Sequence, residues 1–170
     1  MKFKSLISRS KSILKDRNDD FSFGDFKSGA NWMSQLLSYV RDEKFINSNN
    51  AVPFNYYGVL KYGLSLLGAI VPFLLLDFSI IACFVSVVLF YLIEIHFLFL
   101  FPLLLDDVKE PFRTNILMIY KIGLVQCFLI VIPIASYMIL GLLNFKNPLK
   151  YWYTECLSVL ILYTDETTNR

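Results

Sequence analysis

Charged residues and histidine are scarce in this sequence, and their scarcity excludes several classes of protein. Asp, Glu, Lys and Arg make up 18% of the 170 residues, whereas a typical soluble domain has about 25%. The single histidine excludes the multi-histidine iron and zinc sites of membrane desaturases and proteases. A net charge of +2 is too small to indicate a nucleic-acid partner.

Nucleotide-binding, redox and hydrolase motifs are also missing. The sequence contains no GxSxG, P-loop, GxGxxG, HExxH or CxxC pattern. The three cysteines, Cys83, Cys127 and Cys156, are far apart and have no zinc-type spacing. We therefore expect no cofactor and no bound metal.

Long apolar runs dominate what is present, since 56% of the residues are hydrophobic. Residues 78–105 contain no Lys, Arg or Asp, and about 20 apolar residues of helix cross a bilayer. Comparable runs occupy 57–76, where Lys61 is near enough to the start to reach the headgroups, and 116–143. The sequence therefore predicts an all-α integral membrane protein with three transmembrane helices.

The connections between these runs differ in length. Asp77 is the only charge between the first two runs, so we expect a tight antiparallel hairpin in which Asp77 or Ser79 caps the second helix. The polar stretch 106–115 is expected to be a loop before the third span. We accordingly divide the chain into an N-terminal segment, 1–56, and a transmembrane bundle, 57–170.

Amphipathic segments flank the spans. Residues 1–17 are basic and rich in serine, which favours a helix lying on an anionic membrane surface, with a disordered basic tail as an equal alternative and an organellar transit peptide as a weaker one. Residues 31–46 have helical spacing of apolar side chains. Residues 148–163 are short for a span, so we favour an interfacial or re-entrant helix over a fourth transmembrane helix.

The distribution of basic residues predicts the orientation. Nine of the 16 Lys and Arg residues precede residue 51, and Lys109 and Arg113 lie in the 106–115 loop. Positive charges favour the cytoplasmic side, so the N-terminus should be cytoplasmic. Lys146 and Lys150 agree with this only if a fourth span exists. We expect a bacterial inner (cell) membrane, with an organellar membrane less favoured.

Three polar residues inside the predicted spans form a candidate intramembrane site. Glu94, His96 and Gln126 are costly at bilayer depth and are therefore functional candidates. Glu94 and Gln126 are expected to meet near the midplane as a hydrogen-bonded pair that holds the helices together, or else as part of a transport path. His96 lies about 200° around the helix from Glu94, so it is expected to be satisfied by packing or by a backbone carbonyl, with a pair to Asp107 as the alternative.

The acidic cluster at Asp106, Asp107 and Glu110 is the most catalytic-looking pattern. Such carboxylates can hold Mg²⁺ against a diphosphate, and their spacing resembles the aspartate-rich motifs of membrane prenyltransferases. Those enzymes need a second cluster, which this chain lacks. A solvated helix end is the favoured interpretation.

Three functions remain open. The leading one is a structural or accessory subunit that packs against another membrane protein or forms a homo-oligomer within the lipid bilayer. The second is an oligomeric small transporter or channel that uses Glu94, Gln126 and His96. The third is a membrane enzyme of lipid or phosphate chemistry that uses Asp106, Asp107 and Glu110.

Overall fold

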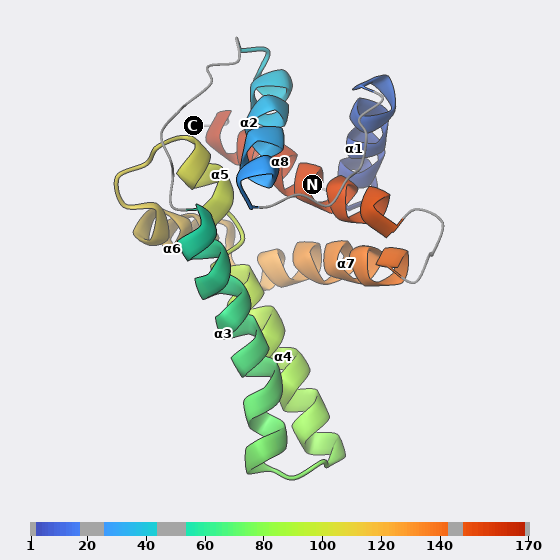
Figure 1. Ribbon diagram of the computed structural model, residues 1–170, viewed down its shortest axis with the longest axis vertical. Helices are drawn as coiled ribbons and strands as arrows, with labels where there is room; N and C mark the ends of the chain where they lie inside the picture. The colour runs from blue at the N-terminus through green and yellow to red at the C-terminus, as the bar shows by residue number, and fades with distance from the viewer. Residues whose placement is uncertain (1–2, 18–25, 44–53, 143–147, 169–170) are drawn as a thin grey trace. The chain divides into compact units, whose positions relative to one another are not determined.

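Helices are the only regular secondary structure in the described part of the chain. The computed structural model describes residues 3–17, 26–43, 54–142 and 148–168, and these contain eight helices and no strand (Figure 1). The predicted all-α class is therefore confirmed. The chain forms two compact units, one made of residues 1–51 and 129–170 and the other of residues 52–128.

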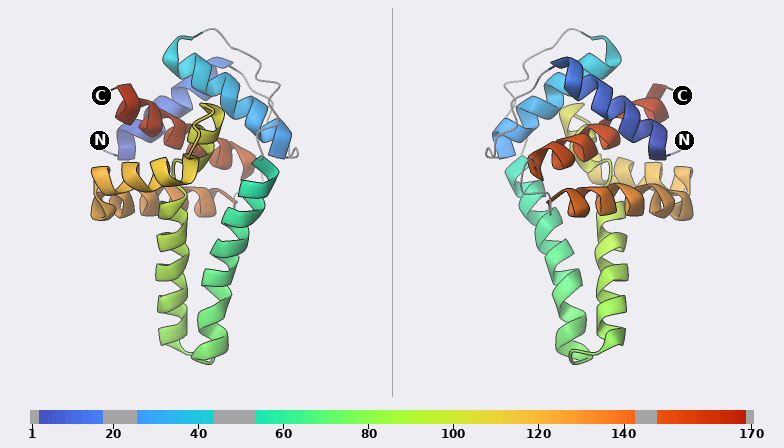
Figure 2. Two further views of the ribbon diagram at one scale, coloured as in Figure 1. Left: turned by 90° about the vertical axis from the view of Figure 1, so that its left-hand side faces the viewer. Right: turned by 90° about the vertical axis from the view of Figure 1, so that its right-hand side faces the viewer.

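The second unit is built on an antiparallel hairpin of α3 (Phe54–Leu75) and α4 (Ile80–His96), which run side by side in both views of Figure 2. Asp77 adopts a positive φ of 51° in the turn, a conformation that Asp tolerates better than most residues. The Ser79 hydroxyl then accepts a hydrogen bond from the Ala82 N–H at 3.2 Å and caps α4. The predicted tight hairpin and its cap are confirmed.

Both arms of this hairpin are long and apolar enough to cross a membrane. α3 has 22 residues, about 33 Å of helix at 1.5 Å per residue. The second candidate covers Ile80–Leu105, or 26 residues. It is interrupted, however, because the chain turns at residues 97–99 before the short helix α5 (Leu100–Leu105) begins.

The predicted straight helix over 116–143 is wrong. In its place, α6 (Pro111–Ile122) and α7 (Leu124–Leu142) meet at Gly123 with a bend of 100°. Gly123 has a φ of 98°, which L-residues rarely adopt and which ends the helix. The helix pair counts as a third candidate span only if the bent pair is taken as one broken span.

The first unit packs the two ends of the chain together. α8 (Pro148–Thr168) contacts both α1 (Phe3–Arg17) and α2 (Phe26–Arg41). The core side chains share relative exposures below 7% and comprise Leu6, Ile7, Leu14, Leu36, Leu37, Leu157, Leu160, Ile161, Leu162 and Tyr163. The apolar face of the N-terminal helix is thus buried in protein. The disordered tail is therefore wrong as a prediction, and the helix keeps no apolar face free for insertion into a membrane.

Polar side chains fix how α1 and α8 meet. Ser10 and Ser158 are fully buried, and their hydroxyl oxygens lie 2.8 Å apart. Nearby, Arg9 forms an ion pair with Asp165 at 3.2 Å. These two contacts thus join α1 to α8 through a buried hydroxyl pair and an ion pair.

α2 and α8 are joined by aromatic contacts. The Trp32 ring meets the Tyr153 ring edge-on at 4.3 Å, and the Arg41 guanidinium lies 5.6 Å from the centre of the Tyr163 ring. The predicted helix over 31–46 therefore exists, although it starts five residues earlier and ends at Arg41. Residues 44–46 lie outside the described residues.

The C-terminal helix is longer than predicted and extends to Thr168. α8 is not among the described helices that are long and apolar enough to span a membrane. A Cβ atom at Gly141 of α7 would lie 2.1 Å from the Tyr151 Cγ atom of α8, so glycine is needed where these helices meet.

Candidate intramembrane polar site

An ion pair joins the two arms of the α3–α4 hairpin. The Lys61 ammonium on α3 lies 2.9 Å from Glu94 Oε2 on α4. The Ser65 hydroxyl, one turn after Lys61, donates a hydrogen bond of 2.8 Å to Glu94 Oε1. Only 14% of the Lys61 side chain and 19% of the Glu94 side chain are exposed, so both carboxylate oxygens have partners in a largely apolar setting.

Helix geometry explains why these three residues meet. Lys61 and Ser65 are four residues apart and therefore lie on one face of α3. A Cβ atom at Gly68 would lie 2.5 Å from Ile93 Cδ1 and 3.7 Å from Leu89 Cβ. The absence of a side chain at Gly68 thus lets α4 come close enough for Glu94 to reach across.

Aromatic rings surround the lysine. Its ammonium lies 5.6 Å from the ring centres of both Tyr62 and Phe101, within the range of a cation–π contact. Phe101 of α5 in turn stacks on Phe54 of α3 at 5.4 Å. Lys61 therefore connects α3, α4 and α5, a set of contacts that the sequence pattern did not predict.

The expected pair of Glu94 and Gln126 is also wrong. Glu94 is bound by Lys61 and Ser65, and Gln126 is exposed on α7. The prediction failed because it assumed one straight helix over 116–143, which would have placed Gln126 opposite Glu94. The bend at Gly123 removes that register.

His96 contacts the backbone, which is one of the two predicted possibilities. Its Nδ1 atom lies 2.7 Å from the Leu92 carbonyl oxygen, four residues earlier in α4. The Tyr120 ring of α6 faces it edge-on with centres 6.3 Å apart. The alternative pair with Asp107 required α4 to continue unbroken, and the turn at residues 97–99 ends the helix first.

A buried asparagine, which the sequence pattern did not predict as a site residue, closes the break between α4 and α5. Asn115 of α6 is fully buried. Its Oδ1 accepts a 2.8 Å hydrogen bond from the Phe99 N–H, and its Nδ2 donates to the His96 carbonyl. The Leu100 N–H binds the Phe97 carbonyl, so Asn115 supplies a donor where the helix ladder skips His96. The position of this asparagine directly before an apolar run was the one sequence feature that could have indicated a buried polar contact.

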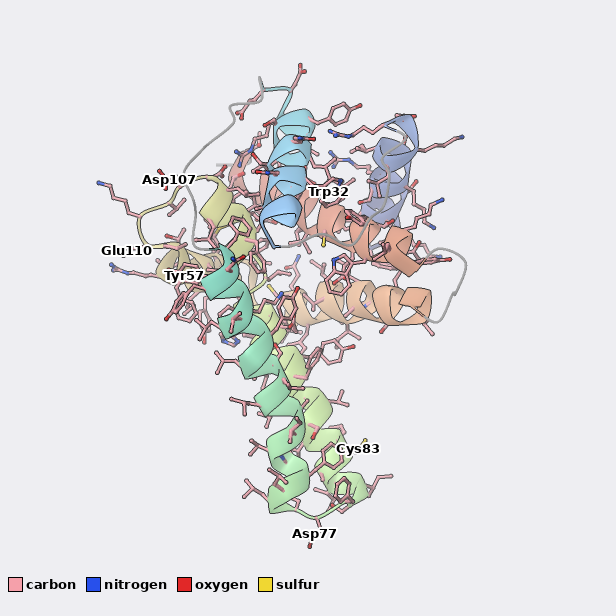
Figure 3. All side chains as sticks on the ribbon, viewed as in Figure 1. Trp32, Tyr57, Asp77, Cys83, Asp107 and Glu110 are labelled. Carbon is pink, nitrogen blue, oxygen red and sulfur yellow. The ribbon has the colours of Figure 1, made fainter. Side chains whose placement is uncertain are left out.

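The acidic cluster lies on the loop between α5 and α6, where Figure 3 labels Asp107 and Glu110. Glu110 forms an ion pair of 3.0 Å with Arg113, and both side chains are well exposed. Asp107 has a positive φ of 50°. Within the described ranges, no group of three or more His, Cys, Asp or Glu side chains is placed to hold a metal ion.

The Lys61–Glu94 pair could have been predicted from the sequence. Lys61 stands 16 residues before Asp77 and Glu94 stands 17 residues after it, so a hairpin that turns at Asp77 places them side by side. Chemically, the pair carries two ionised groups at no net charge. Such a pair can remain in an apolar environment because each charge neutralises the other.

No protein family, no curated protein and no solved structure matches this chain.

Proposed function

We propose that this protein is a membrane-integral accessory subunit that works by lateral packing against a membrane protein or a second copy of itself. The observation that carries the proposal is the α3–α4 hairpin, which directs its charged groups at each other and large apolar side chains outward. A hairpin that pairs Glu94, the only carboxylate within its two helices, with Lys61 offers contact surface and leaves no unpaired carboxylate along those helices for a transported ion.

The outward surface is extensive. The most exposed apolar side chains of the two arms have relative exposures of 57–88% and include Val59, Leu66, Leu67, Leu74, Leu75, Ile80, Ile81 and Phe84. In water such a surface is a site of association. In a bilayer it contacts acyl chains or another transmembrane helix.

The proposed topology places α3 and α4 across the bilayer, with the bent α6–α7 pair as a third, broken span. The N-terminus and the α5–α6 loop face the cytoplasm, because both carry lysine and arginine while the Asp77 turn carries neither. A bacterial inner membrane is the proposed location. We propose no nucleic-acid partner.

Site-specific photocrosslinking tests the proposal. A photoreactive residue is placed singly at Leu66, Leu67, Ile81 and Phe84 in the full-length protein in its native membrane. Lateral packing predicts a protein adduct of defined mass from positions on one face of the hairpin and lipid adducts from the others. Lipid adducts alone at all four positions would contradict the proposal.

A flux measurement on the full-length protein in reconstituted vesicles separates the transport alternative. Glu94→Gln is expected to alter the stability of the hairpin without abolishing any flux across reconstituted vesicles. If the wild-type protein conducts an ion and Glu94→Gln abolishes that conductance, the accessory function is wrong.

A further inference from the structure

The solvent-facing side of α1 carries a row of lysines. Lys4, Lys11 and Lys15 are exposed, and so are Ser8 and Ser12 between them. Residues 4, 8, 11 and 15 are separated by three or four positions and therefore follow one side of the helix. We call Lys4, Lys11 and Lys15 the lysine face.

The opposite side of α1 is already occupied. Leu6, Ile7 and Leu14 are buried, with Ser10 against Ser158 of α8. An amphipathic helix that inserts into a bilayer needs its apolar face free for the acyl chains. α1 therefore cannot bind a membrane by insertion while it remains packed on α8.

Within α1 itself, few negative charges offset the lysine face. The positive charge of Arg9, on the flank, is paired with Asp165. Asp16 is the only acidic residue of α1. Lys11 lies 5.1 Å from the centre of the Tyr137 ring, a contact that leaves its positive charge in place. The face thus presents three positive charges over about 16 Å of helix.

We infer that the lysine face of α1 docks electrostatically on anionic phospholipid headgroups of the cytoplasmic leaflet, while the apolar face stays packed on α8. The inference rests on the proposed membrane topology, in which α1 belongs to the cytoplasmic part of a chain that is anchored in the same bilayer, so its effective concentration at that leaflet is raised. Anionic headgroups are the expected binding partner of the lysine face, because the cytoplasmic leaflet is negatively charged and attracts lysines that cluster close to transmembrane spans.

The expected strength follows from the number of lysines. Each lysine near an anionic surface raises the ratio of docked to undocked protein about fivefold. Removing two of the three should therefore lower that ratio about 25-fold. The attraction should also weaken as salt shortens the screening length.

Energy transfer in nanodiscs tests the inference on the full-length protein. The native cysteines are replaced, a donor dye is attached at Ser8→Cys, and acceptors are placed on the lipid headgroups. Docking predicts high transfer in discs that contain phosphatidylglycerol, low transfer in phosphatidylcholine discs, and loss of transfer at high salt. Equal transfer in both lipids, or transfer that salt does not change, would overturn it.

Two matched double variants test whether the positive charge of the lysine face is what causes docking. Lys4→Gln with Lys15→Gln should lose the transfer, whereas Lys4→Arg with Lys15→Arg should keep it. If the glutamine variant behaves as the wild type, the lysine face is not the docking surface.

A second dye distinguishes this failure from a failure of the proposed topology. A dye at Phe84→Cys on the hairpin should be quenched by nitroxides on the acyl chains in either lipid. Quenching at residue 84 without transfer at residue 8 would reject only the docking of α1. Absence of quenching at residue 84 would reject the membrane hairpin itself.

Discussion

At the scale of single residues, the environment of Glu94 determines how the two helices of the hairpin are held together. Both of its oxygens are bound, one by Lys61 and one by Ser65. An ion pair removed from water gains little net stability from its attraction, but loss of one partner leaves a charge without compensation. Glu94 and Lys61 are therefore expected to depend on each other.

A double-mutant cycle measures this dependence. Lys61→Met or Glu94→Gln alone should lower the free energy of unfolding in detergent micelles by about 3–5 kcal/mol, because each leaves its partner unpaired. The double variant should lose far less than the sum. Additive losses would show that the two side chains do not interact.

Asn115 is the second residue with a clear expected effect. Asn115→Ala removes the acceptor for the Phe99 N–H and the donor to the His96 carbonyl at a buried position. Each buried polar group that loses a partner costs about 1–3 kcal/mol. We expect the free energy of unfolding to fall by about 2–4 kcal/mol.

An exposed asparagine serves as the control. Asn55→Ala on the surface of α3 should change the free energy of unfolding by no more than about 0.5 kcal/mol. Equal effects of the two substitutions would mean that Asn115 does not hold the break between α4 and α5.

At the scale of helices, the apolar runs predicted where helices form but not where they break. The hairpin followed from two long runs joined at Asp77, and Ser79 was recognisable as a cap. The break after His96 was not recognisable, since residues 97–99 are as apolar as their neighbours. It depends on Asn115, a tertiary contact from 16 residues away, which periodicity within one helix cannot reveal.

The bend at Gly123 lies inside an apolar run, so hydropathy alone did not predict it, although the glycine itself was a possible signal. Its φ of 98° belongs to glycine, although a Cβ atom there would meet no other atom within 4 Å. Gly123→Ala should therefore destabilise the protein by about 1–3 kcal/mol through backbone strain alone. Thermal unfolding in detergent measures the effect.

Gly63 provides the matched comparison, since a Cβ atom there is equally free of contacts and the residue lies within α3. Gly63→Ala should be neutral or stabilising by up to about 1 kcal/mol. If both alanine variants lose the same stability, the bend at Gly123 does not depend on its positive φ.

At the scale of the whole molecule, the chain combines a hairpin suited to lipid with a helical unit made from its two ends. The sequence suggested that the N-terminal and C-terminal helices bind the membrane separately, because each is amphipathic. Instead, the apolar faces of α1 and α2 pack against α8. An amphipathic pattern shows that a face will be buried, and it does not show whether lipid or protein will cover it.

In the proposed topology, α3 and α4 cross the membrane as an antiparallel hairpin with the Asp77 turn outside, and cysteine accessibility tests this most directly. In a cysteine-free background, Phe78→Cys at the turn and Lys109→Cys in the α5–α6 loop are treated with a membrane-impermeant maleimide in intact cells. Residue 78 is expected to react at once and residue 109 only after the membrane is permeabilised. Reaction of both positions from the same side would contradict a membrane-crossing hairpin, and reaction of residue 109 alone would contradict its orientation.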